Sequence, residues 1–420
     1  MELKVVGRSI PRVDAISKVT GKALYPQDIY MENMVYGKTL RSEIPHGYVK
    51  LDTREAEKID GVLRIFTYKD VPKNEHGVVF KDHEVFISKK VRRIGDPLAF
   101  VVAENEKICD LALKKIKVTY EELEGVFDPV EAMKDDAPKV HDKSNILYHF
   151  KIRRGNVEEA FKRCYAIVEN TYRTHMVDHA FLQPEAGVSY MDEEGNVVVI
   201  VATQYPHFDR EEIANALQIP IDKVRIINTH VGGAFGARED ITLQIHLALA
   251  AKVLNRPVKT VYSREESFLA HCKRHAMVMR YKTGADKEGK LLAMEAEIIG
   301  DTGAYASWGA NVMRKAGVHA TGPYYIPHVK VDSYAVYTNN PFAGAMRGFG
   351  ATQVPIAHEQ QMDMLAEKLG MDPVTIRLKN IFRKGSITAT GQVLTEGVPL
   401  EKCVIKAAEA IGFHLEGREA

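Results

Sequence analysis

Cysteine is scarce in this sequence, and neither sign of charge is in excess. The 420 residues include four cysteines, which are Cys109, Cys164, Cys272 and Cys403, and no Cys-x-x-Cys pair. Because an iron–sulfur cluster takes about four thiolates, and small disulfide scaffolds are dense in cysteine, this spacing argues against either feature in the chain alone. The 57 basic residues nearly cancel the 56 acidic ones. The net charge of +1 therefore gives no electrostatic case for a nucleic-acid partner or an anionic membrane surface.

Long hydrophobic runs are also missing. Apolar stretches such as residues 197–202 are far shorter than the ~20 residues that span a bilayer. The N-terminal residues 1–15 contain no apolar core followed by a cleavage site, so the sequence indicates no signal peptide. We therefore expect a cytoplasmic protein with no membrane segment.

What is present is ordinary globular composition, with 45% hydrophobic residues and enough length for more than one core. Hydrophobic spacing predicts a mixture of strands and helices. Predicted strands lie at 62–67, 97–103, 117–120, 196–203, 224–228, 258–262 and 291–299, and predicted helices at 104–115, 209–217, 240–254 and 352–369. We predict an α+β fold with one domain over residues 1–130 and a second over residues 131–420, separated near the polar stretch 135–144.

A first glycine-rich segment, residues 230–240 (HVGGAFGARED), joins a predicted strand to a predicted helix and is called the first turn from here on. Its glycines and alanines let the backbone approach a ligand closely. The free amides at the start of the following helix are expected to face the same place, which suits a phosphate or a metal-oxo group. The alternative is a tight turn that needs small residues for packing alone. The spacing is neither GxGxxG nor a P-loop.

A second glycine-rich segment, residues 343–353 (AGAMRGFGATQ), precedes another predicted helix and is called the second turn from here on. Arg347 in this segment can bind an anion through its planar guanidinium. Phe349, presented between two glycines, can stack on an aromatic ring. The alternative is an exposed arginine beside a core phenylalanine.

Together these segments resemble the molybdenum-binding subunit of the xanthine dehydrogenase/aldehyde oxidase family. Residues 7–14 and 18–23 resemble the entry into the family's α/β hammerhead domain, and residues 93–102 resemble a later strand of it. Thr203-Gln204, the first turn and the second turn resemble the family's metal-site motifs in the same order. The resemblance covers nearly the whole chain and implies a hammerhead domain followed by the first molybdopterin-binding α+β domain.

The resemblance also implies roles for individual residues. The residues it places at the molybdenum cofactor are Gln204, Gly233, Phe235, Gly236, Arg347 and Gly348. Of these, Gln204, Phe235 and Arg347 are expected to lie next to the metal without ligating it. The residues it places at the substrate are Glu239, Lys315 and Phe349. Without the motif context, Gln204 is a solvated side chain at a strand end, and Glu239 is a first-turn glutamate favoured by the helix dipole.

Some positions depart from the family pattern. Ala234 and Ala237 replace commoner glycines, and Arg238 replaces a common lysine. Lys315, with Arg314 beside it, stands where xanthine-converting members have an arginine that holds the purine. This departure weakens the case for xanthine itself, but a cation at this place can pair with an anionic substrate.

The chain is also shorter than the usual molybdenum subunit, whose second half carries most dinucleotide contacts and the general-base glutamate. Some members divide that subunit into a large and a medium chain, and this sequence resembles the large chain of the members that hydroxylate nicotinate. The resemblance therefore implies that no catalytic base lies on this chain and that the glutamate lies on a medium molybdopterin subunit.

The implied reaction is hydroxylation of nicotinate to 6-hydroxynicotinate, with water as the oxygen source. The implied cofactor is molybdopterin cytosine dinucleotide, with molybdenum carrying a terminal sulfur or selenium ligand. Electrons are expected to leave through two [2Fe–2S] clusters and FAD, on further subunits, to NADP.

Three other hypotheses remain open from the sequence. The first is a split-chain xanthine or purine dehydrogenase, which Glu239 favours. The second is a non-catalytic scaffold or cofactor-insertion protein. The third is a hydrolase that uses His179 and Glu185, although no GxSxG nucleophile motif accompanies them.

Overall fold

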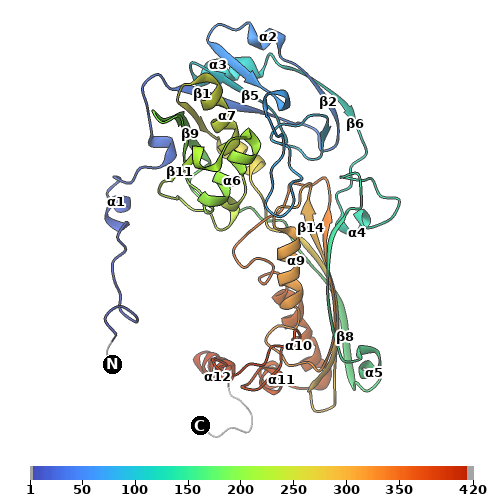
Figure 1. Cartoon of the computed structure of the whole chain (residues 1–420). Helices are drawn as coiled ribbons and strands as arrows, with labels where there is room; N and C mark the ends of the chain where they lie inside the picture. The colour runs from blue at the N-terminus through green and yellow to red at the C-terminus, as the bar shows by residue number, and fades with distance from the viewer. Residues whose placement is uncertain (1–2, 414–420) are drawn as a thin grey trace.

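The computed structural model describes residues 3–413, which form an upper and a lower body, one above the other in the view of Figure 1. A seven-stranded sheet in the order β11-β10-β9-β12-β1-β5-β3 forms the centre of the upper body. Its strands are β1 Val35–Arg41, β3 Val62–Phe66, β5 Pro97–Ala103, β9 Ala186–Met191, β10 Val197–Val201, β11 Val224–Asn228 and β12 Val258–Val261.

This sheet combines strands from both parts of the chain. Strand β1 pairs in parallel with β12, with Val35 opposite Val258. Strand β5 is buried on both faces, because Phe100 and Val102 belong to one core cluster while Ala99 and Val101 belong to another. The division of the chain near residue 130 stays a prediction, since the sheet is continuous across it.

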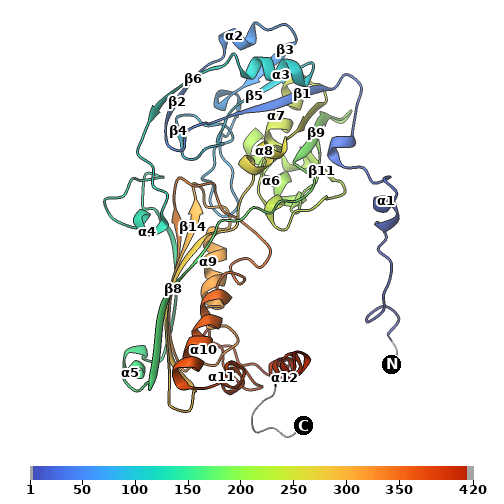
Figure 2. The ribbon, with the colours of Figure 1, turned by 180° about the vertical axis from the view of Figure 1, so that it is seen from behind.

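A five-stranded sheet in the order β7-β15-β14-β13-β8 forms the lower body. Its strands are β7 Ile146–Arg154, β8 Ala166–Thr174, β13 Met277–Ala285, β14 Leu291–Gly303 and β15 His328–Tyr337. Helices α9 (Gly309–Val318) and α10 (Pro355–Leu369) pack on one face of it through residues such as Met313 and Leu365 (Figure 2). A three-stranded sheet, β4-β2-β6, completes the upper body.

The remaining elements are shorter or peripheral. The strands of the small sheet are β2 Gly47–Asp52, β4 Lys90–Val91 and β6 Lys117–Glu122. The other α-helices are α1 Ala15–Val19, α2 Arg54–Glu57, α3 Glu106–Leu113, α4 Pro129–Ala132, α5 Val157–Phe161, α6 Pro206–Leu217, α7 Gln244–Leu254, α8 Arg264–Ala270, α11 Pro373–Asn380 and α12 Leu400–Ala410. Short 3-10 helices span Pro26–Asp28, Tyr68–Asp70, Ile221–Lys223 and Ala237–Glu239. Within residues 3–413, no helix combines the length and the apolar character needed to cross a bilayer.

The predicted α+β class and the predicted strands are confirmed, but three helix starts are wrong. Helix α6 begins at Pro206 instead of residue 209, and α10 begins at Pro355 instead of residue 352. The helix predicted from residue 240 begins at Gln244, because Asp240 has an extended backbone and its carboxylate accepts a hydrogen bond from Ser307 Oγ. The Gln244 side chain also accepts from the amides of Thr242 and Leu243. Those amides are therefore occupied, and they do not form the ligand-facing helix start that the sequence suggested.

Candidate functional site

The two glycine-rich turns meet where the upper body joins the lower one. The first turn follows β11 of the seven-stranded sheet, and the second lies between β15 and α10 of the lower body. Gly236 has a φ of +113° and packs so closely that a Cβ there would lie 2.5 Å from the carbonyl oxygen of Ala345. The amide of Arg347 donates to the carbonyl of Phe235 at 2.8 Å. The turns therefore form one continuous backbone surface.

Gln204 lies against the first turn, as the motif order predicts. It stands between β10 and α6, and its backbone amide donates to the carbonyl of Arg238 at 3.0 Å. Its side-chain Oε1 accepts from the amide of Gly236 at 2.9 Å. The Nε2 group makes no hydrogen bond within residues 3–413, so it keeps both donors for a ligand.

Several amides of the two turns also lack a protein acceptor among the described residues. They include the backbone N–H groups of Gly233, Ala234, Phe235, Met346 and Gly348. Phe235 and Phe349 have φ values of +55° and +53°, which non-glycine residues rarely adopt. Backbone strain of this kind is concentrated at active sites and ligand-binding sites. A set of free amides on such a surface suits phosphate or oxo groups.

Arg347 belongs to the same surface. Its backbone is held on both sides, because its amide binds Phe235 and its carbonyl accepts from the Arg274 guanidinium at 2.8 Å. Its own side chain is exposed. It makes no ion pair or hydrogen bond within the described residues, so the guanidinium can bind an anion.

Aromatic side chains lie beside this surface. The Phe349 ring is 5.9 Å from the Trp308 ring, and the Trp308 ring is 6.1 Å from that of Tyr205. The Lys315 ammonium lies 5.9 Å from the Phe349 ring centre, over its face. Within residues 3–413, no carboxylate lies at ion-pair distance from Lys315. The group combines a flat apolar wall with a free cation, which suits a flat anionic ring.

Glu239 faces the same neighbourhood. Burial of its carboxyl raises the pKa to about 7, and the charge of Asp240 adds to the effect. The backbone hydrogen bond from Gln204 to Arg238 brings the next residues along the chain, Tyr205 and Glu239, near each other. Burial and the charge of Glu239 together raise the pKa of Tyr205. Near neutral pH, Glu239 can therefore donate as well as accept a hydrogen bond.

The structure thus brings together Gln204, both turns, Glu239, Lys315 and Phe349. Sequence reasoning missed Trp308 and Tyr205. Trp308 is the single tryptophan of the chain, and Tyr205 directly follows Gln204. Those two facts were the available signals, but no spacing rule connects these positions to Phe349.

His179 and Glu185, the residues of the hydrolase hypothesis, have structural partners instead. His179 Nε2 donates to the carbonyl of Ala345 at 2.7 Å, and Glu185 forms a buried ion pair with His271 at 3.0 Å. No serine or cysteine hydroxyl or thiol contacts His179 as a nucleophile among the described residues. The arrangement gives no support to hydrolysis.

Comparison with known proteins is consistent with this geometry. Residues 140–381 match the molybdopterin cofactor-binding domain, and residues 20–124 match the aldehyde oxidase and xanthine dehydrogenase a/b hammerhead domain. The chain is 45% identical to the nicotinate dehydrogenase large molybdopterin subunit of Eubacterium barkeri, over 98% of each chain.

Other relatives are longer. The chain is 40% identical to a probable xanthine dehydrogenase subunit of Bacillus subtilis, over 88% of this chain and 50% of that one. It superposes on the aldehyde oxidoreductase from Desulfovibrio gigas with a TM-score of 0.91 and 30% identity, over 95% of this chain and 46% of that one. The chain spans about half the length of these two proteins.

Proposed function

Because the chain belongs to the xanthine dehydrogenase/aldehyde oxidase family of molybdenum hydroxylases, we propose that it is the large molybdopterin subunit of an enzyme that hydroxylates nicotinate to 6-hydroxynicotinate. Water supplies the oxygen, and NADP accepts the electrons. The observation that carries the proposal is the 45% identity to a nicotinate dehydrogenase large subunit over 98% of both chains.

We propose the partners that the family resemblance implies. A medium molybdopterin subunit supplies the second half of the cofactor site and the general-base glutamate. An iron–sulfur subunit and an FAD subunit carry the electrons away. The support for an assembly of several chains is that the relative is named as a large molybdopterin subunit.

The residues present fit the molybdenum cofactor. Gly236 leaves no room for a side chain, and the free amides of both turns with the Gln204 Nε2 group offer donors to oxygen atoms. The residues we assign to the cofactor are Gln204, Gly233, Phe235, Gly236, Arg347 and Gly348. The bound cofactor, in its cytosine dinucleotide form with a sulfur or selenium ligand, supplies the redox centre for oxygen transfer from water.

This chain's own contribution is orientation. Phe349 stacks on the pyridine ring, Lys315 pairs with the carboxylate, and Glu239 donates a hydrogen bond from its protonated carboxyl. Holding a ring in a fixed orientation beside the reacting centre lowers the entropic part of the barrier. The aromatic wall excludes water from the face of the ring that it covers.

The experiment is purification of the assembled complex, with metal analysis, mass spectrometry of the co-purified chains and steady-state kinetics. The proposal expects molybdenum, partner subunits and turnover of nicotinate with NADP. A preference for xanthine over nicotinate favours the alternative function, a split-chain xanthine dehydrogenase. Glu239 and the 40% identity to a probable xanthine dehydrogenase subunit are the observations that support this alternative. A complex without molybdenum contradicts both functions and favours the scaffold hypothesis.

Glu239→Gln tests the role of the protonated carboxyl. Because the pKa of Glu239 is raised to about 7, it is protonated below that pH and ionised above it. If the protonated form binds the anionic ring, KM of the native enzyme rises about tenfold per pH unit above ~7. The amide of the variant stays neutral, so its KM stays flat between about pH 6 and 8.5. Glu193→Gln, in the exposed turn after β9, is the control and keeps the native profile; a pH-dependent KM in Glu239→Gln refutes the assignment.

Gln204→Ala tests the cofactor side. The change removes the free Nε2 donors and the acceptor for Gly236, so kcat should fall about tenfold, as the loss of one good hydrogen bond implies. KM should change less than twofold, since Gln204 is not assigned to the substrate. Gln360→Ala, on the exposed side of α10, is the control. Equal kcat in the two variants removes Gln204 from the site.

A further inference from the structure

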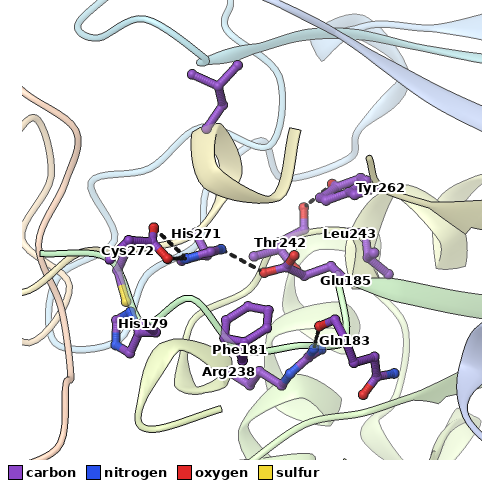
Figure 3. Close-up of polar contacts among 12 residues, drawn as sticks. His179, Phe181, Gln183, Glu185, Arg238, Thr242, Leu243, Tyr262, His271 and Cys272 are labelled. Atoms are coloured by element: carbon purple, nitrogen blue, oxygen red, sulfur yellow. Dashed lines mark hydrogen bonds and ion pairs between the residues drawn. The ribbon is translucent and has the colours of Figure 1, made fainter. Parts of the chain in front are cut away.

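A buried cluster of charged side chains lies behind the two turns, outside the residues assigned to cofactor and substrate. His271 is 0% exposed and contacts Asp178 through Nε2 at 3.0 Å and Glu185 through Nδ1 at 3.0 Å. Lys273 pairs with Asp178 at 2.9 Å. Figure 3 shows His271 reaching Glu185 across the cluster. Two carboxylates thus face an imidazole and an ammonium group.

His271 is charged in this setting. Burial opposes the charge, but the contacts with Asp178 and Glu185 outweigh it and raise the pKa of His271. The same contacts lower the pKa values of both carboxyls, although burial acts to raise them. The imidazolium therefore compensates the buried charge of Glu185, and it shares with Lys273 the charge of the partly buried Asp178.

The two carboxylates are the two ends of one short segment, residues 178–185 (below, the brace). Near its C-terminal end, the brace holds the first turn. The side-chain Oε1 of Gln183 accepts from the backbone amide of Gly232 at 2.7 Å. The backbone amide of Gln183 donates to the carbonyl of Gly232 at 3.2 Å. The Arg238 guanidinium donates to the Gln183 carbonyl at 2.6 Å and lies over the Phe181 ring (Figure 3).

Near its N-terminal end, the brace holds the second turn. His179 Nε2 donates to the carbonyl of Ala345 at 2.7 Å, and burial lowers the pKa of His179 to about 4, so it donates as a neutral ring. This carbonyl is the one that faces Gly236 of the first turn. Residues next to His271 contact the second turn as well, since the Lys273 amide donates to Phe342 and the Gly344 amide donates to Lys273.

We propose that His271 is a positioning residue, which ties Asp178 to Glu185 and so fixes the brace that sets the spacing of the two turns. The consequence for catalysis rests on the proposed function, in which those turns face the molybdenum cofactor. His271 touches neither cofactor nor substrate in this account. It acts through His179 on the second turn and through Gln183 on the first.

The test is His271→Gln in the assembled complex, with hydrogen exchange of peptides that cover residues 231–240 and 343–350. A glutamine cannot carry charge to both carboxylates, so we expect exchange in both turns to accelerate at least tenfold. The kinetic expectation is a kcat lowered at least tenfold with KM within twofold. His46→Gln is the matched control, because His46 is also buried and donates to the carbonyl of Glu124 in the upper body. It should leave both turns and kcat unchanged.

Glu185→Gln is the second variant, which decides the matter if His271→Gln does not assemble. It opens one end of the brace and leaves His271 paired with Asp178. Exchange should accelerate in residues 231–240 and stay within twofold of native in residues 343–350.

The inference is overturned if both turns of His271→Gln exchange hydrogen at the native rate. It is also overturned if hydrogen exchange accelerates equally in both turns of Glu185→Gln. The exchange result does not depend on the substrate. A native complex that does not turn over nicotinate therefore refutes the proposed function without affecting the inference about the brace.

Discussion

Gly236→Ala is expected to lower kcat at least 100-fold and to reduce the molybdenum content of the assembled complex. An added Cβ would lie 2.5 Å from the carbonyl oxygen of Ala345 and 3.0 Å from the amide of Met346, both backbone atoms that cannot rotate away. The turns must separate to accept it, and a displacement of about 1 Å at a reacting centre costs on the order of 100-fold in rate. The measurements are metal analysis and kcat.

Gly195→Ala is the control for the backbone cost alone. Gly195 has a φ of +76°, so alanine there is also strained, but a Cβ would meet nothing within 4 Å. This variant should lose about 1 kcal/mol of stability and keep native turnover. Equal turnover in Gly236→Ala and Gly195→Ala would show that the contact between the turns is irrelevant to the chemistry.

Phe349→Ala is expected to lower kcat/KM by about 10- to 100-fold. Stacking of an aromatic side chain on a heterocyclic base contributes ~1–3 kcal/mol, and each 1.4 kcal/mol is tenfold. The ring packs edge-on against Trp308, with an angle of 65° between the planes, and carries the Lys315 ammonium over its face. Its removal therefore also loosens the groups that flank the substrate.

Phe349→Tyr is the matched variant, since it keeps the ring and should keep kcat/KM within about threefold. Both variants should assemble and bind molybdenum as the native chain does, because Phe349 is assigned to the substrate and not to the cofactor. Native kcat/KM in Phe349→Ala, or an equal loss in Phe349→Tyr, contradicts the stacking role.

The local features of this fold were predictable from the sequence. Strand β5 was visible as a short apolar run after Gly95-Asp96, and it spans residues 97–103 as expected. The two turns were visible because their small residues and their Arg347 and Phe349 are local signals. The α+β class followed from the same patterns.

What could not be predicted depends on contacts between distant residues. The start of α7 is set by Ser307, which is far from Asp240 in sequence and binds its carboxylate. The meeting of Gly236 with Ala345 and the reach of His179 to the same carbonyl join three separate segments. Hydrophobic periodicity carries no information about such pairings. The contact of Trp308 with Phe349 and the role of the brace could therefore be recognised only in the structure.

The central claim is that Gln204 and the two turns form the surface of this chain that faces molybdenum. The most direct test is anomalous diffraction at the molybdenum edge from crystals of the assembled complex. The account predicts a single strong peak beside Gln204, Gly236 and Gly348, at the junction of the upper and lower bodies. A peak elsewhere, with both turns covered by protein and no cofactor density against them, contradicts it.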